Sequence, residues 1–556
     1  MKKSCRHCTQ QFEITDEDLK FYEKISPTFD GQKFEVPPPS LCPDCGHQQR
    51  TSFRNERHLY KRKCDLSGKE IISIFSPDKP YQVYDQSEWW ADKWDPLEYG
   101  QEFDFNRPFF PQFQELLSKV PIISNMVFSS INCEYNAFIV DSKDCYLSTR
   151  IGDSEDVVYS FLALHSTGCY DCYNVSSCQY CYECIDCLNC YNCKFCTLCK
   201  NCTDCTFCYD CSGCKNCFGC VGLRNAEYHF FNKKCTKEEY EKLVQEYNMG
   251  SHKGITEASN KFRTEFQKHP VRVTIMTNAE ESSGDYITNS KKITNSFDVE
   301  HTDTAKDSWG IEYSKDIHSC DFIYYGENCY QHIANAKSSN IFFSFVTTNG
   351  GHNLWYTMYC LNNVQDCFGS VSLKQKKHCI LNKQYSPEEY EKMTAKIIQH
   401  MQKTGEWGEF FPAELSTFGY NETVANSYFP LKREEATKKG WKWHEEEEKE
   451  KQKSNTQIPD DIKGVDESIC EQILTCEVTG KPYKVVPQEF EFYRKMSLPI
   501  PRKSPEQRYK ERMEKRNPRK LRTHQCDKCT KPTQTSVSSS SGKKIYCEKC
   551  YLEEVY

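Results

Sequence analysis

Cysteine falls on every third residue over residues 169–220, and this spacing limits what the chain can fold into more than any other feature of its sequence. Seventeen of the 18 positions in that register are cysteine, and Val175 is the exception. A strand alternates its faces every second residue and a helix turns about every 3.6 residues, so a period of three fits neither. This cysteine ladder is therefore predicted to follow a coil with a period of its own.

The same register continues upstream of the cysteine ladder as lines of twelve residues. From Ser142 the chain reads SKDCYLSTRIGD, SEDVVYSFLALH, STGCYDCYNVSS, CQYCYECIDCLN, CYNCKFCTLCKN, CTDCTFCYDCSG and CKNCFGCVGLRN. Four positions in each line, three residues apart, are small or apolar, and the residue before the second of them is mostly Asn, Asp or Gly. Short repeats with fixed turn positions predict a β-solenoid, whose stacked coils bury what one repeat cannot bury alone.

Twelve-residue coils with inward side chains at every third position resemble the tight β-helix of beetle antifreeze proteins. The resemblance covers the coil length and the inward spacing, and the outward threonine rows of that family are absent here. We therefore carry over its geometry and not ice binding. So small a coil has no room for Leu or Phe at every inward position, whereas Cys, Ser, Ala and Val fit.

Three chemical states of the cysteine ladder are compatible with its sequence. Four inward thiols on one coil, such as those from Cys178 to Cys187, could hold a metal ion or an iron–sulfur cluster. Thiols six residues apart, such as Cys178 and Cys184, could instead be joined as disulfides. We favour a core of reduced thiols, because the same positions upstream hold Ser, Ile, Ala and Val.

A second run of twelve-residue lines begins at Ser290 with SKKITNSFDVEH and reaches VQDCFGSVSLKQ after one-residue slips. The two runs end alike, in CFGCVGLRNAEYHFFNKKCTKEEYEKLV and CFGSVSLKQKKHCILNKQYSPEEYEKMT. Each end is predicted to enter a helix through a capping box, from Thr236 to Glu239 and from Ser386 to Glu389. The chain is therefore expected to contain an internal duplication.

Paired Cys-x2-Cys motifs stand near both ends of the chain. Zinc prefers four tetrahedral ligands, and two such motifs supply four thiolates. We therefore predict two structural Zn²⁺ sites, one formed by Cys5, Cys8, Cys42 and Cys45, and the other by Cys526, Cys529, Cys547 and Cys550.

Each end also carries a copy of the opposite zinc unit that has lost ligands. The segment after Cys64 matches the C-terminal ribbon, but Ser67 takes the next ligand place. The segment around Cys476 matches the N-terminal unit, but Thr479 stands where Cys8 would be. The first copy is expected to have replaced its metal with packing by Trp89 and Trp90.

Two further features have a functional and a structural interpretation. The net charge of −7 means that nucleic-acid binding has to come from local basic patches. The candidate contacts are Arg50, Arg54, Arg57, Lys61, Arg62, Arg516, Arg519, Lys520 and Arg522, although such runs can also be solvated helix faces. An aromatic stripe on the outside of the first solenoid could stack bases, but we favour internal packing for Tyr135, Tyr146, Tyr159, Tyr170, Tyr182, Phe195, Phe207 and Phe218.

Several classes of protein are disfavoured by the sequence. No apolar run is long enough to span a membrane and the N-terminus lacks a secretory segment, so we expect a cytoplasmic protein. In a large chain of this kind, 36 cysteines indicate metal sites or buried thiols in preference to disulfides. A glycine-rich phosphate loop and an HExxH motif are both absent, which disfavours an enzyme without excluding one.

The motifs NCYNC, CKNCFGC, FNKKCTKEEYEK, RNPRKL and IYCEKCYLEEVY together resemble a family of cysteine-rich zinc-ribbon proteins from reduced-genome bacteria. The resemblance covers most of the chain and implies zinc-binding ends around a cysteine-rich middle. Some members carry a coenzyme A transferase label of the carnitine/bile-acid type, which no motif in this chain supports. The resemblance implies no particular activity.

The sequence thus predicts a mainly β protein with α additions, in which two solenoids of twelve-residue coils are flanked by zinc-ribbon-like units. The expected segments are a zinc-binding unit with a basic helix (1–63), a degenerate zinc-ribbon unit (64–117), the cysteine-rich solenoid with its capping helix (118–248), a linker (249–289), the second solenoid with its capping helix (290–402), an aromatic-rich packing segment (403–443), a charged linker (444–467), a degenerate zinc unit with a basic helix (468–523) and a zinc ribbon (524–556).

The expected function is that of a non-enzymatic zinc-binding scaffold or adaptor. Its predicted partner is RNA, DNA or a ribonucleoprotein, bound through the basic ends. The alternative is a thiol- or metal-cluster-based redox or metal-storage protein that uses the cysteine ladder.

Overall fold

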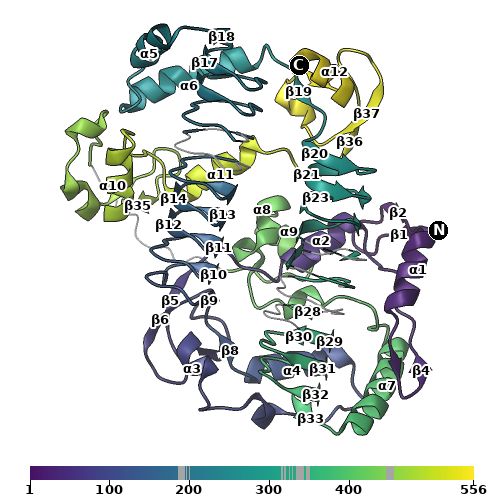
Figure 1. Cartoon of the computed structure of the whole chain (residues 1–556). Coiled ribbons are helices and arrows are strands. Elements are labelled where there is room, and N and C mark those ends of the chain that lie inside the picture. The colour runs from purple at the N-terminus through teal and green to yellow at the C-terminus, as the bar shows by residue number, and fades with distance from the viewer. Residues whose placement is uncertain are drawn as a thin grey trace. The chain divides into compact units, whose positions relative to one another are not determined.

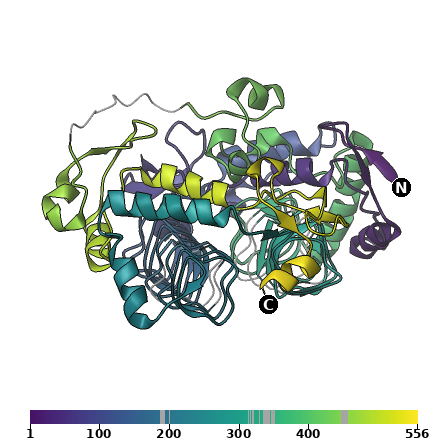
Figure 2. The same ribbon diagram turned by 90° about the horizontal axis from the view of Figure 1, so that it is seen from above.

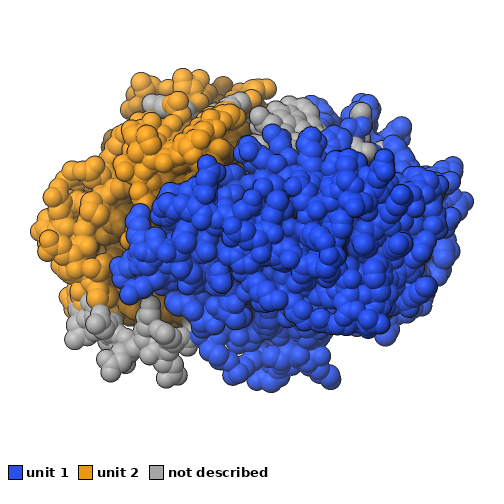
Figure 3. Space-filling view, turned by 90° about the horizontal axis from the view of Figure 1, so that it is seen from below, with its two compact units in different colours: residues 1–125, 274–445 blue, residues 126–273, 446–556 orange. Residues whose placement is uncertain are grey.

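The computed structural model describes residues 1–185, 194–195, 197–198, 201–312, 314, 317–318, 321–324, 326–328, 330–333, 344–345, 351–445 and 456–555. The chain divides into two compact units, which Figure 3 colours separately. Unit 1 consists of residues 1–125 and 274–445, and unit 2 of residues 126–273 and 446–556. The N-terminal segment therefore folds with the second run of repeats, and the C-terminal segment folds with the first.

The first run of repeats forms a β-solenoid in unit 2. Strands stack in parallel in the order β9 (Val127–Phe128), β10 (Ala137–Val140), β11 (Thr149–Gly152), β13 (Phe161–Leu164) and β15 (Tyr173–Ser176) (Figure 1). Ile139 pairs with Ile151, Ile151 with Ala163, and Ala163 with Val175, so each coil takes twelve residues. These inward side chains are buried, which confirms the predicted register.

The corners of these coils lie in the left-handed region of backbone space. The predicted turn formers Asn132, Asp144, Asp156 and Asn216 have φ between 48° and 56°. Asn, Asp and Gly reach this region at the lowest steric cost. Larger residues such as Tyr159, with φ of 53°, also adopt it at other corners, where the stacked neighbours hold them. Seen from above in Figure 2, successive coils lie over one another.

Helices and a short terminal sheet close the coils of unit 2. The sheet contains β16 (Lys215–Phe218), β17 (Glu227–Phe230) and β18 (Lys233–Lys234), and helix α5 (Lys237–Gln245) follows with the predicted capping box at Thr236. The segment 249–289, expected as a linker, instead holds α6 (His252–Phe266) and strands β19 (Val271–Arg272), β20 (Met276–Glu280) and most of β21 (Gly284–Lys291). Helix α6 forms there because Phe262 packs against the aromatic ring of Phe207.

The second run of repeats forms parallel coils in unit 1. They begin at β20, one coil before the predicted start at Ser290, and continue through β21, β23 (Ser296–Glu300), β25 (Trp309–Glu312) and β27 (Asp321–Tyr324). Strands β29 (Gly351–Trp355), β31 (Val364–Phe368), β32 (Lys377–Ile380) and β33 (Lys383–Gln384) follow, before helix α7 (Pro387–Thr404). Leu354 pairs with Cys367, a spacing of 13, which confirms a predicted slip. The capping box at Ser386 is also present.

The remaining elements attach the chain ends to these coils. In unit 1 they include α1 (Asp16–Ile25), α2 (Pro43–Thr51), α3 (Gln86–Trp90), α4 (Phe109–Lys119), α8 (Val424–Tyr428) and α9 (Arg433–Lys438). In unit 2 they are α10 (Pro487–Lys495), α11 (Pro505–Lys515) and α12 (Glu548–Val555). Phe411, Phe418 and Trp441 are buried, as expected for the aromatic-rich segment. Within the described residues, no helix is both long enough and apolar enough to cross a membrane.

Candidate metal centres

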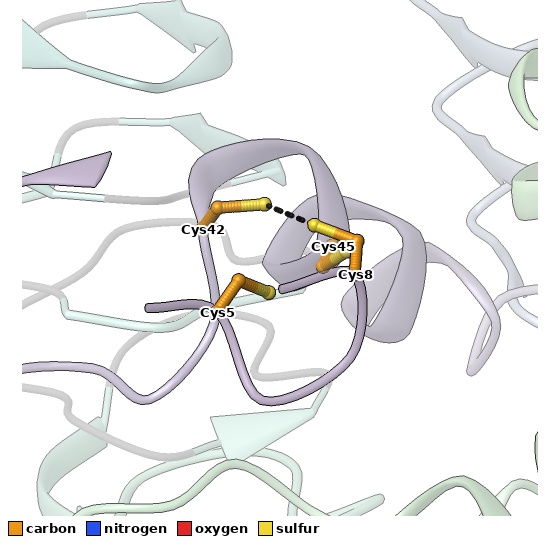
Figure 4. A group of neighbouring side chains, drawn as sticks. All are labelled: Cys5, Cys8, Cys42 and Cys45. Carbon is orange, nitrogen blue, oxygen red and sulfur yellow. Dashed lines mark hydrogen bonds between the residues drawn. The ribbon is translucent and has the colours of Figure 1, made fainter. Parts of the chain in front are cut away.

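Four cysteine sulfurs meet in the N-terminal segment of unit 1. The ligand atoms of Cys5, Cys8, Cys42 and Cys45 all lie within 4.8 Å of one another, and Sγ of Cys8 is 3.6 Å from Sγ of Cys42 (Figure 4). The first two come from the turn between β1 (Lys2–Ser4) and β2 (Gln11–Glu13), and the last two from the start of α2. Helix α1 lies in the long gap between these pairs.

A second group of four sulfurs forms in the C-terminal segment of unit 2. The ligand atoms of Cys526, Cys529, Cys547 and Cys550 also lie within 4.8 Å of one another. The first pair follows β36 (Arg522–Gln525) and precedes β37 (Pro532–Thr535). Cys547 lies between β38 (Ile545–Tyr546) and α12, and Cys550 lies in α12. Both groups can therefore hold a metal ion, and four thiolates suit a tetrahedral one.

One cysteine of each site has a lowered pKa, whereas a neighbouring thiol of the same site, Cys45 or Cys550, has a raised pKa. Burial by itself would raise the pKa of Cys526, but the backbone N–H groups of Cys547, Cys529 and Lys528 lower it to about 6. At the other end, the Cys45 thiol beside Cys42 lowers the pKa of Cys42 to about 5. A thiol that is already ionised near neutral pH binds a metal without first losing a proton.

The decayed copies keep the same turn as the intact ones. The N–H four residues after the first cysteine donates to that cysteine's carbonyl in each copy, over 2.8 to 2.9 Å; the donors are Thr9, Gly68, Gly480 and Thr530. All four residues have positive φ, between 61° and 70°. The two copies that retain four cysteines place threonine at this position, and the two decayed copies place glycine.

Other contacts substitute for metal in the decayed copies. Ser504 lies in the place of Cys42, and its side chain accepts a hydrogen bond from the Gln507 N–H and so caps helix α11. In the other copy, Cys64 Sγ still accepts a hydrogen bond from the Asp85 N–H at 3.2 Å, as Cys526 does from Cys547. Trp89 is fully buried there, which agrees with the expected aromatic packing.

Three of the predicted nucleic-acid contacts lie inside the protein. Arg50 and Arg54 are 3% and 4% exposed, and they pair with Asp321 and Glu56. Arg516 is 8% exposed and donates to the Tyr173 hydroxyl at 3.2 Å. A buried guanidinium with an internal partner is not available to bind phosphate. The prediction that these three residues contact nucleic acid is therefore wrong, and their roles are structural.

The other predicted basic residues lie closer to solvent. Lys61 and Lys520 are exposed, and Arg57 and Arg519 are half-buried. Arg62 pairs with Asp65 at 2.9 Å, and Arg522 donates to the Val537 carbonyl at 2.8 Å.

Sequence reasoning missed the acidic partners of the buried arginines. Asp171 accepts from Arg508 at 2.9 Å and from Arg512 at 2.7 Å, while Asp321 accepts from Arg50 at 3.0 Å. One signal was available: Arg50 and Arg512 each stand 14 residues before the first cysteine of the following ribbon. That equal spacing marks the two arginines as equivalent, although it does not identify the aspartates.

The described thiols of the cysteine ladder are not joined in disulfides, and they donate hydrogen bonds to backbone carbonyls. Cys205 Sγ donates to the carbonyls of Thr203 at 3.4 Å and Cys214 at 3.6 Å. Ser148 Oγ makes the same two kinds of contact, to Tyr146 and Val157. Cysteine therefore replaces serine as an inward donor with more apolar volume. Five ladder cysteines lie outside the described residues, namely Cys187, Cys190, Cys193, Cys196 and Cys199.

Within the described residues, the groups of three or more close metal-ligand atoms are the two terminal ones. A scan against models of known protein families finds no match to this chain, and a search of curated proteins finds no relative.

Proposed function

We propose that this chain is a non-enzymatic cytoplasmic scaffold with two structural Zn²⁺ sites, whose exposed basic residues bind RNA, DNA or a ribonucleoprotein. The proposal also assigns the two runs of coils to two separate solenoids of a duplicated protein. One observation carries it: each unit uses a buried arginine from its zinc-type segment to hold an aspartate of its own coils. The zinc-type segments are thus building blocks of the two units.

All-thiolate coordination supports a structural role and zinc as the metal. Catalytic zinc sites usually combine three protein ligands with an open position for water or substrate. Here each group offers four cysteine ligands. These fill all four positions of a tetrahedral site and leave none for water or substrate. Zinc would then hold together the two cysteine pairs of each terminal segment.

The C-terminal segment is the better candidate for a nucleic-acid contact. Residues 516–555 contain nine lysines and arginines against four acids, whereas the whole chain has a net charge of −7. Five of these lysines are exposed, namely Lys520, Lys528, Lys531, Lys544 and Lys549. Lysines on such a surface can neutralise backbone phosphates and release counterions, which makes binding weaker at higher salt.

Fluorescence anisotropy with labelled single-stranded RNA and double-stranded DNA, repeated across a salt series, tests the proposal. The triple variant Lys520→Ala, Lys531→Ala, Lys544→Ala is expected to weaken binding and to reduce the salt dependence. A matched triple variant of exposed lysines in unit 1, at Lys377, Lys396 and Lys403, should bind like the unchanged protein. Absence of salt-sensitive binding would refute the nucleic-acid partner, and a metal content other than two zinc ions per chain would refute the two zinc sites.

The alternative of a redox or metal-storage protein places its chemistry in the cysteine ladder. Anaerobic purification followed by metal analysis and absorption spectroscopy separates it from the scaffold. Iron, or zinc well above two atoms per chain, would favour the alternative.

A further inference from the structure

A row of aromatic rings follows one edge of the coils in unit 2. Neighbouring centroids are 5.8 Å apart for Tyr135 and Tyr146, 5.9 Å for Tyr146 and Tyr159, and 4.9 Å for Phe195 and Phe207. Successive members of the row lie 11 to 13 residues apart, so each ring lies about one coil from the next. This aromatic stripe is the one that the sequence predicts.

Helices from other parts of unit 2 cover most of the stripe. Phe492 of α10 stacks on Tyr170 at 3.8 Å, and Phe262 of α6 stacks on Phe207 at 6.0 Å. Tyr159, Tyr170 and Phe218 are accordingly 5%, 1% and 1% exposed. The favoured prediction of internal packing is confirmed for this part of the stripe.

The cover ends before the first ring of the stripe. Tyr135 is 41% exposed, and Tyr146 is half-buried. Their rings meet at an interplanar angle of 57°, and part of the Tyr135 ring is open to solvent. A shallow groove of about 520 Å³ lies over them, bounded by the coil corners and by α10.

Carboxylates line this groove. Asp156 is occupied internally, since it accepts hydrogen bonds from the Tyr170 hydroxyl and the Gln488 amide, and Asp144 lies 3.4 Å from Lys143. Glu134 and Glu491 are exposed, and within the described residues neither has an ion-pair partner. The groove therefore combines an aromatic floor with uncompensated negative charge.

The segments that cover the rest of this surface bring cations onto its rings. Arg508 of α11 lies 5.0 Å from the centroid of Tyr159, a ring of the stripe, and Lys495 of α10 lies 3.9 Å from Tyr180, which packs against the same cluster of rings. A cation over an aromatic face is attracted by the ring quadrupole, by about 0.5 to 2 kcal/mol depending on desolvation. The internal contacts thus show what kind of segment this surface accepts.

We infer that the open end of the stripe docks a lysine- or arginine-bearing peptide segment of a partner protein. The aliphatic part of the basic side chain packs on Tyr135 and Tyr146, and its charge lies near Glu134 and Glu491. The segment continues the cover that α10 provides over the next rings. This acidic surface is distinct from the basic C-terminal segment, so the inference stands or falls separately from nucleic-acid binding.

Anisotropy titration of the full chain with a fluorescein-labelled peptide of alternating glycine and lysine tests the inference. The expected result is saturable binding that disappears when norleucine replaces lysine. Tyr135→Leu keeps apolar area but removes the ring, and it should weaken binding about threefold to tenfold, which corresponds to the energy of one cation–π contact. The double variant Glu134→Gln, Glu491→Gln should weaken it at least as much.

The matched control is the double variant Glu227→Gln, Glu238→Gln, which removes two exposed carboxylates of unit 2 outside the groove. It should bind the peptide like the unchanged protein. Equal losses in both double variants would show only general attraction to an acidic protein and would overturn the inference. An unaffected Tyr135→Leu variant, or equal binding of the norleucine peptide, would overturn it as well.

Discussion

Arg512 donates to Asp171 over 2.7 Å, across 341 positions of chain and with both side chains at most 1% exposed. Arg50 makes the equivalent contact to Asp321 in the other unit, at 3.0 Å. Two copies of one segment thus dock on two runs of coils with the same residue. In unit 1 the docking helix starts at two metal-ligand cysteines, whereas in unit 2 it starts at the capping Ser504.

Removing the acceptor of this pair should strongly destabilise unit 2. Asp171→Asn leaves Arg508 and Arg512 buried without their shared counter-charge, and breaking a buried pair in this way costs about 3–5 kcal/mol. Hydrogen exchange of β13 and β15 in the full chain measures the local loss. The control is Glu155→Gln, which breaks the exposed Lys143–Glu155 pair and should cost below about 1 kcal/mol. Similar losses in the two variants would contradict the assignment.

The threonine of each intact turn adopts a backbone conformation that is unfavourable for a β-branched residue. A β-branched residue at positive φ costs roughly 1–2 kcal/mol relative to the right-handed region, whereas glycine adopts it freely. Thr530→Gly should therefore raise the zinc affinity of the ribbon by up to about fivefold, after allowance for the extra freedom of glycine in the unfolded chain. Competition with a zinc chelator measures this change.

The reverse substitution in a decayed copy provides the control for the turn. Gly68 has φ of 70° and no neighbouring atom within 4 Å of the position of an added Cβ. Gly68→Thr should thus cost only the backbone strain, roughly 1–2 kcal/mol, in thermal unfolding. The strain would be disproved if Gly68→Thr left the thermal stability unchanged and Thr530→Gly bound zinc more weakly.

The free energy of unfolding of unit 1 should decrease as the pH is raised from about 4 to about 6, because of Asp307. Burial raises the pKa of this carboxyl to about 6, despite a hydrogen bond donated by Asn295. The folded state therefore holds its proton more tightly than the unfolded chain, whose aspartate has a pKa of about 3.9. Asp307 therefore stabilises the folded state fully below the pKa of the unfolded chain. This stabilisation, up to about 3 kcal/mol, is lost as the pH rises through the pKa of the folded state.

Urea unfolding of the full chain at a series of pH values measures this loss. Asp307→Asn removes the titrating group and should flatten the profile over that interval. Asp303→Asn, at an exposed aspartate four residues away, should leave the profile as it is. A profile that keeps its slope in Asp307→Asn would assign the effect to another group.

The cysteine ladder should be reduced and protected. Native protein treated with a thiol reagent after metal chelation is expected to react rapidly at the cysteines of the two terminal groups, of which Cys8 and Cys529 are exposed. The described ladder thiols should react only on unfolding, since they are buried and donate to backbone carbonyls. Denaturation without reductant should expose all 36 thiols. A lower total would indicate disulfides.

Substitutions inside the ladder test the size requirement. Cys205→Ser keeps the two inward hydrogen bonds and should cost about 1 kcal/mol, because it loses only apolar volume. Cys205→Leu has to fit extra carbons into a packed coil and should cost about 1–3 kcal/mol. Chemical denaturation compares the two, and a more stable Leu variant would show that the coil has spare room.

Features of the molecule that depend on local spacing could be predicted from the sequence. The twelve-residue register follows from the inward positions, the capping boxes at Thr236 and Ser386 from a Glu three residues on, and the metal groups from paired cysteines. Helix α6 was missed because its polar sequence hides the apolar contacts of Phe262 and Phe266. The prediction of nucleic-acid contacts in the basic runs was wrong in part. The sequence around Arg50 does not show that a buried aspartate pairs with it in the folded protein.

The sequence by itself determined the coils, the four related terminal segments and the two groups of four cysteines, because each is a pattern of neighbouring residues. Only the tertiary structure decided that the N-terminal segment folds with the second run of coils and the C-terminal segment with the first. That choice depends on contacts such as Arg512 with Asp171, whose partners are hundreds of residues apart. Such a pair has no local sequence pattern, because each residue alone resembles an ordinary surface charge. Only the fold, which buries both side chains away from water, makes them partners.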